Sequence, residues 1–147
     1  MENTNEMELI FDSRSSNESF ARVTVAAFMT SLNPTVEEVS DVKTAVSEAV
    51  TNAIVHAYPD SIGQVVVKVR ICPDQVLEVT VRDHGRGIPD VEKARQPMFT
   101  TGGEERSGMG FTIMESFMDR LVVRSTPGRG TTVVMRKRLA PRLKSGT

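Results

Sequence analysis

The chain is poor in the residues from which several classes of protein are built. Of its 147 residues, one is cysteine, one is tyrosine and none is tryptophan. A lone thiol cannot form an internal disulfide, and no Cys/His cluster suits structural zinc, so a disulfide-stapled secreted domain and a zinc domain are both excluded. Lys and Arg number 18 against 19 Asp and Glu, a net charge of −1. The chain therefore lacks the basic field of a general nucleic-acid or membrane-surface binder.

Long apolar runs are also missing. None approaches the ~18 residues of a membrane-spanning helix, and residues 1–8 are polar and acidic, unlike a secretory signal. We expect a cytoplasmic protein with no membrane or direct nucleic-acid partner. The length predicts one domain over residues 1–147, which buries about 70% of its extended surface on folding. The basic C-terminal end suits a strand end and then a flexible tail, which we place at 139–147.

Two capping boxes mark two helices in the first half of the chain. After a short predicted strand at 8–11, Ser15 and Glu18 have the spacing of a capping box and predict a helix over 16–30. Thr35 and Glu38 repeat the pattern and predict a long helix over 36–57, which Pro59 ends. The first helix would bury Phe20, Val23 and Ala27, and the second would bury Val42, Val46, Ala49, Val50 and Ala53.

The second half reads as two hairpins around an irregular stretch and a helix. Strands are predicted at 64–71 and 76–82, the second with Leu77, Val79 and Val81 alternating with polar residues. Residues 83–110 lose this periodicity, as a functional loop does, and we assign a lid to 89–106. A helix at 111–118 and strands at 121–125 and 131–138 follow. This order predicts an α+β, two-layer sandwich: a mixed, mostly antiparallel sheet with helices on one face.

The first candidate site follows a predicted strand. Residues 83–87 read Asp-His-Gly-Arg-Gly. Gly85 and Gly87 would let the backbone turn tightly or approach a ligand, and the Asp83 carboxylate can accept a hydrogen bond from an exocyclic amine. By itself the pattern is equally typical of a tight turn headed by an aspartate.

The second candidate is the run Ser107, Gly108, Met109 and Gly110, just before the helix predicted at 111. A glycine-rich turn at a helix start presents free N–H groups and a positive dipole end, which suit phosphate oxygens. The chain has neither the Walker pattern of a P-loop nor the Gly-x-Gly-x-x-Gly of a Rossmann site. A phosphate site here would be of another kind.

The third candidate is Glu48 with Asn52, four residues apart on the long helix and pointing away from its predicted buried stripe. An amide oxygen suits Mg²⁺, and a carboxylate can deprotonate a hydroxyl that attacks a γ-phosphate. The simpler alternative is an exposed polar pair. His56 continues the same face and is more typical of a helix-end partner than of a catalyst. No Ser/His/Asp or Cys/His set indicates acyl transfer.

The order of these motifs resembles the Bergerat-type ATP site of the gyrase, Hsp90, histidine-kinase and MutL superfamily. The matching segments are residues 48–53, 83–87, 97–101 and 107–110. More closely, the chain is similar to the anti-sigma F factors, small serine kinases of spore-forming bacteria. Their motifs match residues 17–23, 47–53, 94–97 and 105–115, and the similarity extends over about 7–138.

The resemblance implies a role for each candidate. Glu48 would be the catalytic base, Asn52 the Mg²⁺ ligand and Asp83 the acceptor for adenine. Nucleotide contacts are implied for Gly85, Gly87, Thr100, Thr101, Ser107, Gly108, Met109 and Gly110, and partner contacts for Arg22. The implied activity is ATP- and Mg²⁺-dependent phosphorylation of an anti-anti-sigma protein by a homodimer that also sequesters a sigma factor of the sigma F type.

One departure from the family pattern concerns the lid. Many relatives have a lysine directly after Phe-Thr-Thr, where this chain has two glycines and then two glutamates; Arg106 is the candidate substitute. Three alternatives stay open: a general-stress switch kinase, an ATP-binding anti-sigma module without catalysis, and the catalytic half of a histidine kinase or a chaperone-type ATPase. Against the last, no phospho-acceptor histidine helix is recognisable.

Overall fold

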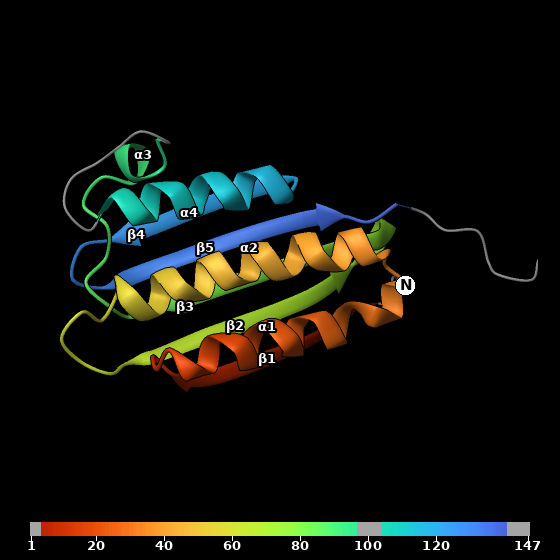
Figure 1. Ribbon diagram of the computed structural model, residues 1–147, viewed down its shortest axis with the longest axis horizontal. Helices are drawn as coiled ribbons and strands as arrows, with labels where there is room; N and C mark the ends of the chain where they lie inside the picture. The colour runs from red at the N-terminus through yellow and green to blue at the C-terminus, as the bar shows by residue number, and fades with distance from the viewer. Residues whose placement is uncertain (1–3, 97–103, 141–147) are drawn as a thin grey trace, which may run out of the picture.

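In the described part of the chain, five strands form one sheet, and the helices pack on one of its faces (Figure 1). The computed structural model describes residues 4–96 and 104–140, without the side chains of 104–109. In chain order the elements are β1 (Asn5–Asp12), α1 (Ser16–Phe28), the 3₁₀ turn η1 (Met29–Leu32), α2 (Val36–Val55), β2 (Gln64–Cys72), the turn η2 (Pro73–Gln75), β3 (Val76–Asp83), α3 (Val91–Ala94), α4 (Glu104–Phe117), β4 (Arg120–Thr126) and β5 (Gly130–Arg138). The α+β two-layer prediction is confirmed.

The sheet has the strand order β1-β2-β3-β5-β4. All four pairings that the described strands make are antiparallel, so the parallel pair that a mixed sheet requires is not among them. β3 is the central strand, and its inward residues Leu77, Val79 and Val81 are buried as their alternation predicts. Its last residue, Asp83, therefore lies at the middle of one end of the sheet.

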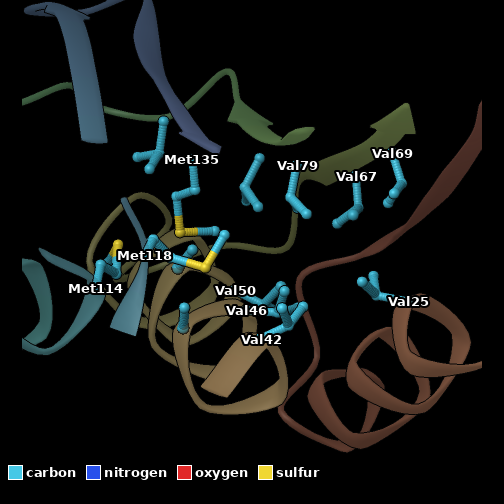
Figure 2. Packing of buried hydrophobic residues seen from close by; sticks show 14 of the residues in the cluster. Val25, Val42, Val46, Val50, Val67, Val69, Val79, Met114, Met118 and Met135 are labelled. Carbon is cyan, nitrogen blue, oxygen red and sulfur yellow. The ribbon is translucent and has the colours of Figure 1, made fainter. Parts of the chain in front are cut away.

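The core lies between α2 and the centre of the sheet. All five residues of the predicted α2 stripe are buried. Figure 2 shows Val42, Val46 and Val50 pointing toward Val79 of β3, with Val67 of β2 beside it. This packing fixes how α2 is rotated about its axis, and with it the direction of the polar side chains on its other faces.

The second capping box is present and the first is not. Thr35 Oγ1 accepts from the Glu38 amide at 3.0 Å, and the Glu38 side chain accepts from the Thr35 amide at 2.9 Å. Ser15 has a helical backbone and makes no side-chain cap, so that prediction was wrong. Glu18 instead pairs with Arg22 one turn along α1, at 3.0 Å.

The predicted buried face of α1 was also wrong. Ala21 and Val25 are fully buried, whereas Phe20 and Val23 are more than half exposed. Small side chains let α1 lie close to the sheet, and this contact outweighs the larger apolar residues in setting the helix phase. Two apolar side chains consequently remain on the outer face of α1.

The last described residues, Leu139 and Ala140, pack against the fold. Leu139 is buried, and its amide donates to Gln75 O at 2.9 Å, while the Ala140 amide donates to Glu38 at 3.0 Å. The tail predicted to begin at 139 is thus anchored through Ala140, and the rest of it lies outside the described residues.

Within the described ranges, no helix has the length and apolarity to cross a membrane.

Candidate functional site

A cavity of about 140 Å³ opens between α2, the end of β3 and α4. Its walls are mostly apolar, with a few polar groups at one side. It is lined by Ala49, Asn52, Ala53, His56, Ala57, Val81, Asp83, Arg86, Gly87, Ile88, Pro89, Ala94, Phe111, Thr131 and Val133. An apolar cavity of about 150 Å³ is enough to bind benzene. This cavity therefore has the size and lining to take a flat aromatic ring.

Asp83 is the buried acid of this cavity, with 7% of its surface exposed. Its Oδ1 accepts from the amides of Gly85 at 2.9 Å and Thr131 at 3.2 Å. Burial raises the pKa of the Asp83 carboxyl, and these two amides oppose the rise. Both bonds use Oδ1, so Oδ2 is left to accept from a further donor.

The turn after Asp83 is fixed by hydrogen bonds to residues 56–58, which directly follow α2. The Arg86 amide donates to Ala57 O at 3.0 Å, and its Nε donates to His56 O at 2.8 Å. The Tyr58 hydroxyl accepts from the His84 amide and donates to Gln64 O, both at 2.7 Å. The segment that follows the acid is therefore held by backbone and side-chain bonds together.

The two glycines of this turn are required by backbone packing. A Cβ on Gly85 would lie 2.3 Å from Ala57 O, and one on Gly87 would lie 2.4 Å from Thr126 O. Gly87 also has φ +76°, a conformation that side chains disfavour. Gly87 lines the cavity. Gly85 acts instead by letting the turn approach the end of α2 and by donating to Asp83.

Glu48 and Asn52 face the backbone of α4 at Gly110. A Cβ built on Gly110 would lie 3.2 Å from Asn52 Nδ2 and 3.3 Å from Glu48 Oε1. Both α2 side chains are half-buried, so the alternative of an exposed polar pair is wrong. The structure thus brings together the predicted residues Glu48, Asn52 and Gly110. Because Gly110 has no side chain, it leaves space for the other two side chains.

Asn52 carries an unsatisfied polar atom. Its Nδ2 is buried and has no hydrogen-bond partner within the part of the chain that the structure describes. An unpaired buried amide costs about 1–3 kcal/mol, and such groups in native proteins usually mark a ligand, ion or water. Asn52 also lines the cavity whose polar side holds Asp83. The Asn52 amide is therefore placed to donate a hydrogen bond to a ligand that lies between the cavity and Glu48.

The glycine-rich phosphate motif is not at a helix start. Helix α4 begins at Glu104, seven residues before the predicted start at 111, so Ser107, Gly108, Met109 and Gly110 lie inside it. The free amides of a helix are those of its N-cap and its first three residues, so all four predicted residues lie past that part of α4. The lid predicted as irregular over 89–106 likewise contains α3 and the first turn of α4.

The remaining predicted residues are placed only in part. Thr100 and Thr101 lie outside the described residues, and the side chain of Arg106 is not described. Arg22 lies on α1 and lines a groove that ends at Glu48. Of the residues that the structure describes, no cluster of three or more His, Cys, Asp or Glu side chains could hold a metal ion. A metal ion bound here would therefore take most of its oxygen ligands from a bound small molecule and from water.

Thr131 and Phe111 belong to the cavity and were not predicted. Phe111 is 1% exposed and forms part of its apolar wall. The register of β3 with β5 ends at Arg82 opposite Thr132, which brings Thr131 beside Asp83. No local signal gives this neighbour, because Asp83 and Thr131 are 48 residues apart and the β3–β5 register joins two different hairpins.

Comparison with known proteins agrees with this arrangement. The family model of the histidine kinase-like ATPase domain matches residues 11–137. The anti-sigma F factor of Geobacillus kaustophilus (strain HTA426) is 58% identical over 137 residues, 92% of this chain and 94% of that protein. That of Geobacillus stearothermophilus is 59% identical over 134 residues, 90% of this chain and 92% of that protein.

The fold also has a solved counterpart. The histidine kinase domain of the Erythrobacter litoralis EL346 blue-light activated histidine kinase superposes with a TM-score of 0.56 at 22% identity, over 83% of this chain and 60% of that one. This likeness concerns the fold alone. The match of the ATPase domain model and the identity over nine-tenths of the chain together show that this protein belongs to the anti-sigma F factor family.

Proposed function

We propose that the protein is an ATP- and Mg²⁺-dependent serine kinase that phosphorylates an anti-anti-sigma protein, and that it binds and inhibits a sigma factor of the sigma F type. The observation that carries the proposal is the unpaired buried amide of Asn52, set between an aromatic-sized cavity and the Glu48 carboxylate. The membership of this chain among the anti-sigma F factors supports the sigma factor as a partner.

In this proposal adenine occupies the apolar cavity, and its exocyclic amine donates to Asp83 Oδ2. Burial strengthens that hydrogen bond, because little water competes for the carboxylate. The Asp83 carboxylate accepts a hydrogen bond from the amine of adenine, and the cavity walls exclude groups of another shape. Recognition of the base therefore rests on Asp83 and on the residues that line the cavity.

The phosphates would lie toward Gly110, beside Asn52 and Glu48. Asn52 can offer Oδ1 to Mg²⁺ and Nδ2 to a phosphate oxygen, which would satisfy the unpaired donor. Mg²⁺ keeps several waters and draws further ligands from phosphates, so one protein oxygen fits its chemistry. When bound, the ion neutralises charge on the transferring phosphoryl group. Contact of Thr100, Thr101, Ser107, Gly108 and Met109 with the nucleotide stays a prediction.

The chemical step transfers the γ-phosphoryl group to the substrate serine. The serine oxygen forms the new P–O bond, the bond to the bridging oxygen of ADP breaks, and Glu48 takes the hydroxyl proton. Positioning and charge stabilisation supply most of the rate in such transfers, and a positioned base contributes about 10²–10⁴-fold.

Glu48→Gln tests the assignment with little change of shape. Label transfer from ATP to an anti-anti-sigma protein should fall by about 10²–10⁴-fold, with nucleotide affinity by calorimetry nearly unchanged. Glu37→Gln, at an exposed position in the first turn of the same helix, is the control and should behave as wild type. Normal transfer by Glu48→Gln would refute the catalytic role. Nucleotide binding by the wild type without transfer would favour a non-catalytic ATP-binding module.

The binding role is proposed for the face that carries Arg22. Its guanidinium is held by Glu18 at 3.0 Å and is about one-third exposed, so it is oriented and still accessible. We place sigma factor and substrate contacts there and expect a homodimer. Light scattering of the protein alone and with sigma factor measures both stoichiometries, and a monomer that binds sigma factor with full affinity would contradict this arrangement.

A further inference from the structure

A groove of about 560 Å³ runs along α2 to Glu48, separate from the cavity. Seven of its lining residues belong to α2, Arg22 comes from α1, and Pro34 lies just before α2. It is lined by Arg22, Pro34, Val36, Val39, Ser40, Lys43, Thr44, Ser47 and Glu48. Glu48 thus borders two spaces: the nucleotide side at Gly110 and this groove.

Of the two cationic side chains that line the groove, one has no counterion among the described side chains. Arg22 is neutralised by Glu18 at 3.0 Å. Asp41, two residues before Lys43, is engaged by Lys137 at 3.5 Å. Lys43 makes no ion pair or side-chain hydrogen bond among residues 4–96 and 110–140. Its ammonium group is therefore available to a carboxylate that enters the groove.

The chemistry of the groove suits a polypeptide. A nucleic-acid strand would bring repeated phosphates against Glu48, with only Lys43 unpaired to meet them. At the other end Val36 is 89% exposed and stands beside Pro34 and Val39. An extended peptide that has an apolar residue, an acidic residue and a hydroxyl in that order would match the apolar, basic and acidic sections of the groove.

We propose that this groove binds the extended segment that carries the acceptor serine of the protein substrate, and that Lys43 is a specificity residue which pairs with an acidic side chain of that segment. The proposal rests on the kinase function proposed above. Lys43 and Glu48 are five residues apart, about 7.5 Å along the helix axis. An extended chain advances about 3.3 Å per residue. The acidic residue should therefore lie two or three positions from the serine.

Steady-state transfer kinetics of Lys43→Gln, with the full chain and an intact anti-anti-sigma protein as substrate, test the assignment. The KM for the protein substrate should rise about tenfold or more, with kcat within about threefold of wild type, as loss of substrate binding predicts. The affinity for ATP should not change. Lys68→Gln, on the opposite face of the sheet beside Glu6, is the matched control, and thermal unfolding checks that both variants fold.

A charge exchange identifies the partner residue. Each acidic residue within three positions of the phosphorylated serine is replaced by lysine in turn, and each substrate is assayed with wild type and Lys43→Glu. One of these substrates should be poor for wild type and recover with Lys43→Glu. An unchanged KM in Lys43→Gln, or a loss of sigma-factor binding with unchanged KM, would overturn the role of Lys43 while leaving the kinase function standing. Absence of transfer by the wild type would overturn both proposals.

Discussion

Replacing Asp83 by asparagine separates the two roles of this side chain, which are to hold the turn and to bind the ligand. In the structure Oδ1 accepts from Gly85 and Thr131, and Oδ2 is left for a ligand. An asparagine must keep its oxygen at the Oδ1 position, because the opposite orientation would set its NH₂ against two amide donors. The fold is then preserved, and a donor replaces the acceptor that faces the cavity.

The magnitude follows from the bond that is lost. A hydrogen bond to a charged group contributes about 1.5–3 kcal/mol, and every 1.4 kcal/mol is a factor of ten in affinity. The affinity for ATP should therefore fall by about 10- to 140-fold in Asp83→Asn. Unfolding should remain a single cooperative transition, since the Gly85 and Thr131 bonds survive.

Calorimetric titration with two nucleotides makes the test specific. Wild type should bind ATP more tightly than a purine triphosphate without the 6-amino group, and Asp83→Asn should bind the two about equally. Asp60→Asn, at an exposed position in the loop after α2, is the control. An Asp83→Asn protein that still prefers ATP over the analogue would refute the assignment of Asp83 to the adenine amine.

Three further predictions concern the surroundings of the site. Gly110→Ala places a methyl group 3.2–3.4 Å from Asn52 and Glu48, so Mg·ATP affinity and transfer should both fall in calorimetric and label-transfer assays, whereas wild-type values would show that α4 yields freely. Gly87→Ala, at φ +76° and 2.4 Å from Thr126 O, should lower the free energy of unfolding by about 1–3 kcal/mol or more; an unchanged urea midpoint would contradict the backbone account. Burial raises the Asp83 pKa, so the folded state keeps this proton to higher pH than the unfolded chain. Stability of wild type relative to Asp83→Asn should then decline as pH rises from the ordinary aspartate pKa through the raised one, and a rise over that range would reverse the sign of the argument.

The parts of the fold that local sequence controls could be predicted. Thr35 and Glu38 satisfy each other across one turn, so their spacing alone locates the start of α2. The alternation of β3 places Asp83 at the end of a buried strand. These features depend on neighbours within four residues, which the sequence displays directly.

The parts that tertiary packing decides could not be predicted. The Ser15 motif has the right spacing, yet its backbone is already helical and makes no cap. The face of α1 is set by the close fit of Ala21 and Val25, which outweighs the larger Phe20. Thr131 reaches Asp83 across 48 residues of chain. Convergence of Glu48, Asn52 and Asp83 was suggested by family resemblance, because helical spacing gives no distance to another element.

An NMR titration of backbone amides with Mg·ATP tests most directly whether this cavity is the nucleotide site. Signals of Gly85, Gly87, Ile88 and Thr131 should shift together and saturate at one affinity, since these amides surround the cavity and its acid. Saturable shifts confined to the groove around Lys43, or none at all with folded protein, would contradict the account.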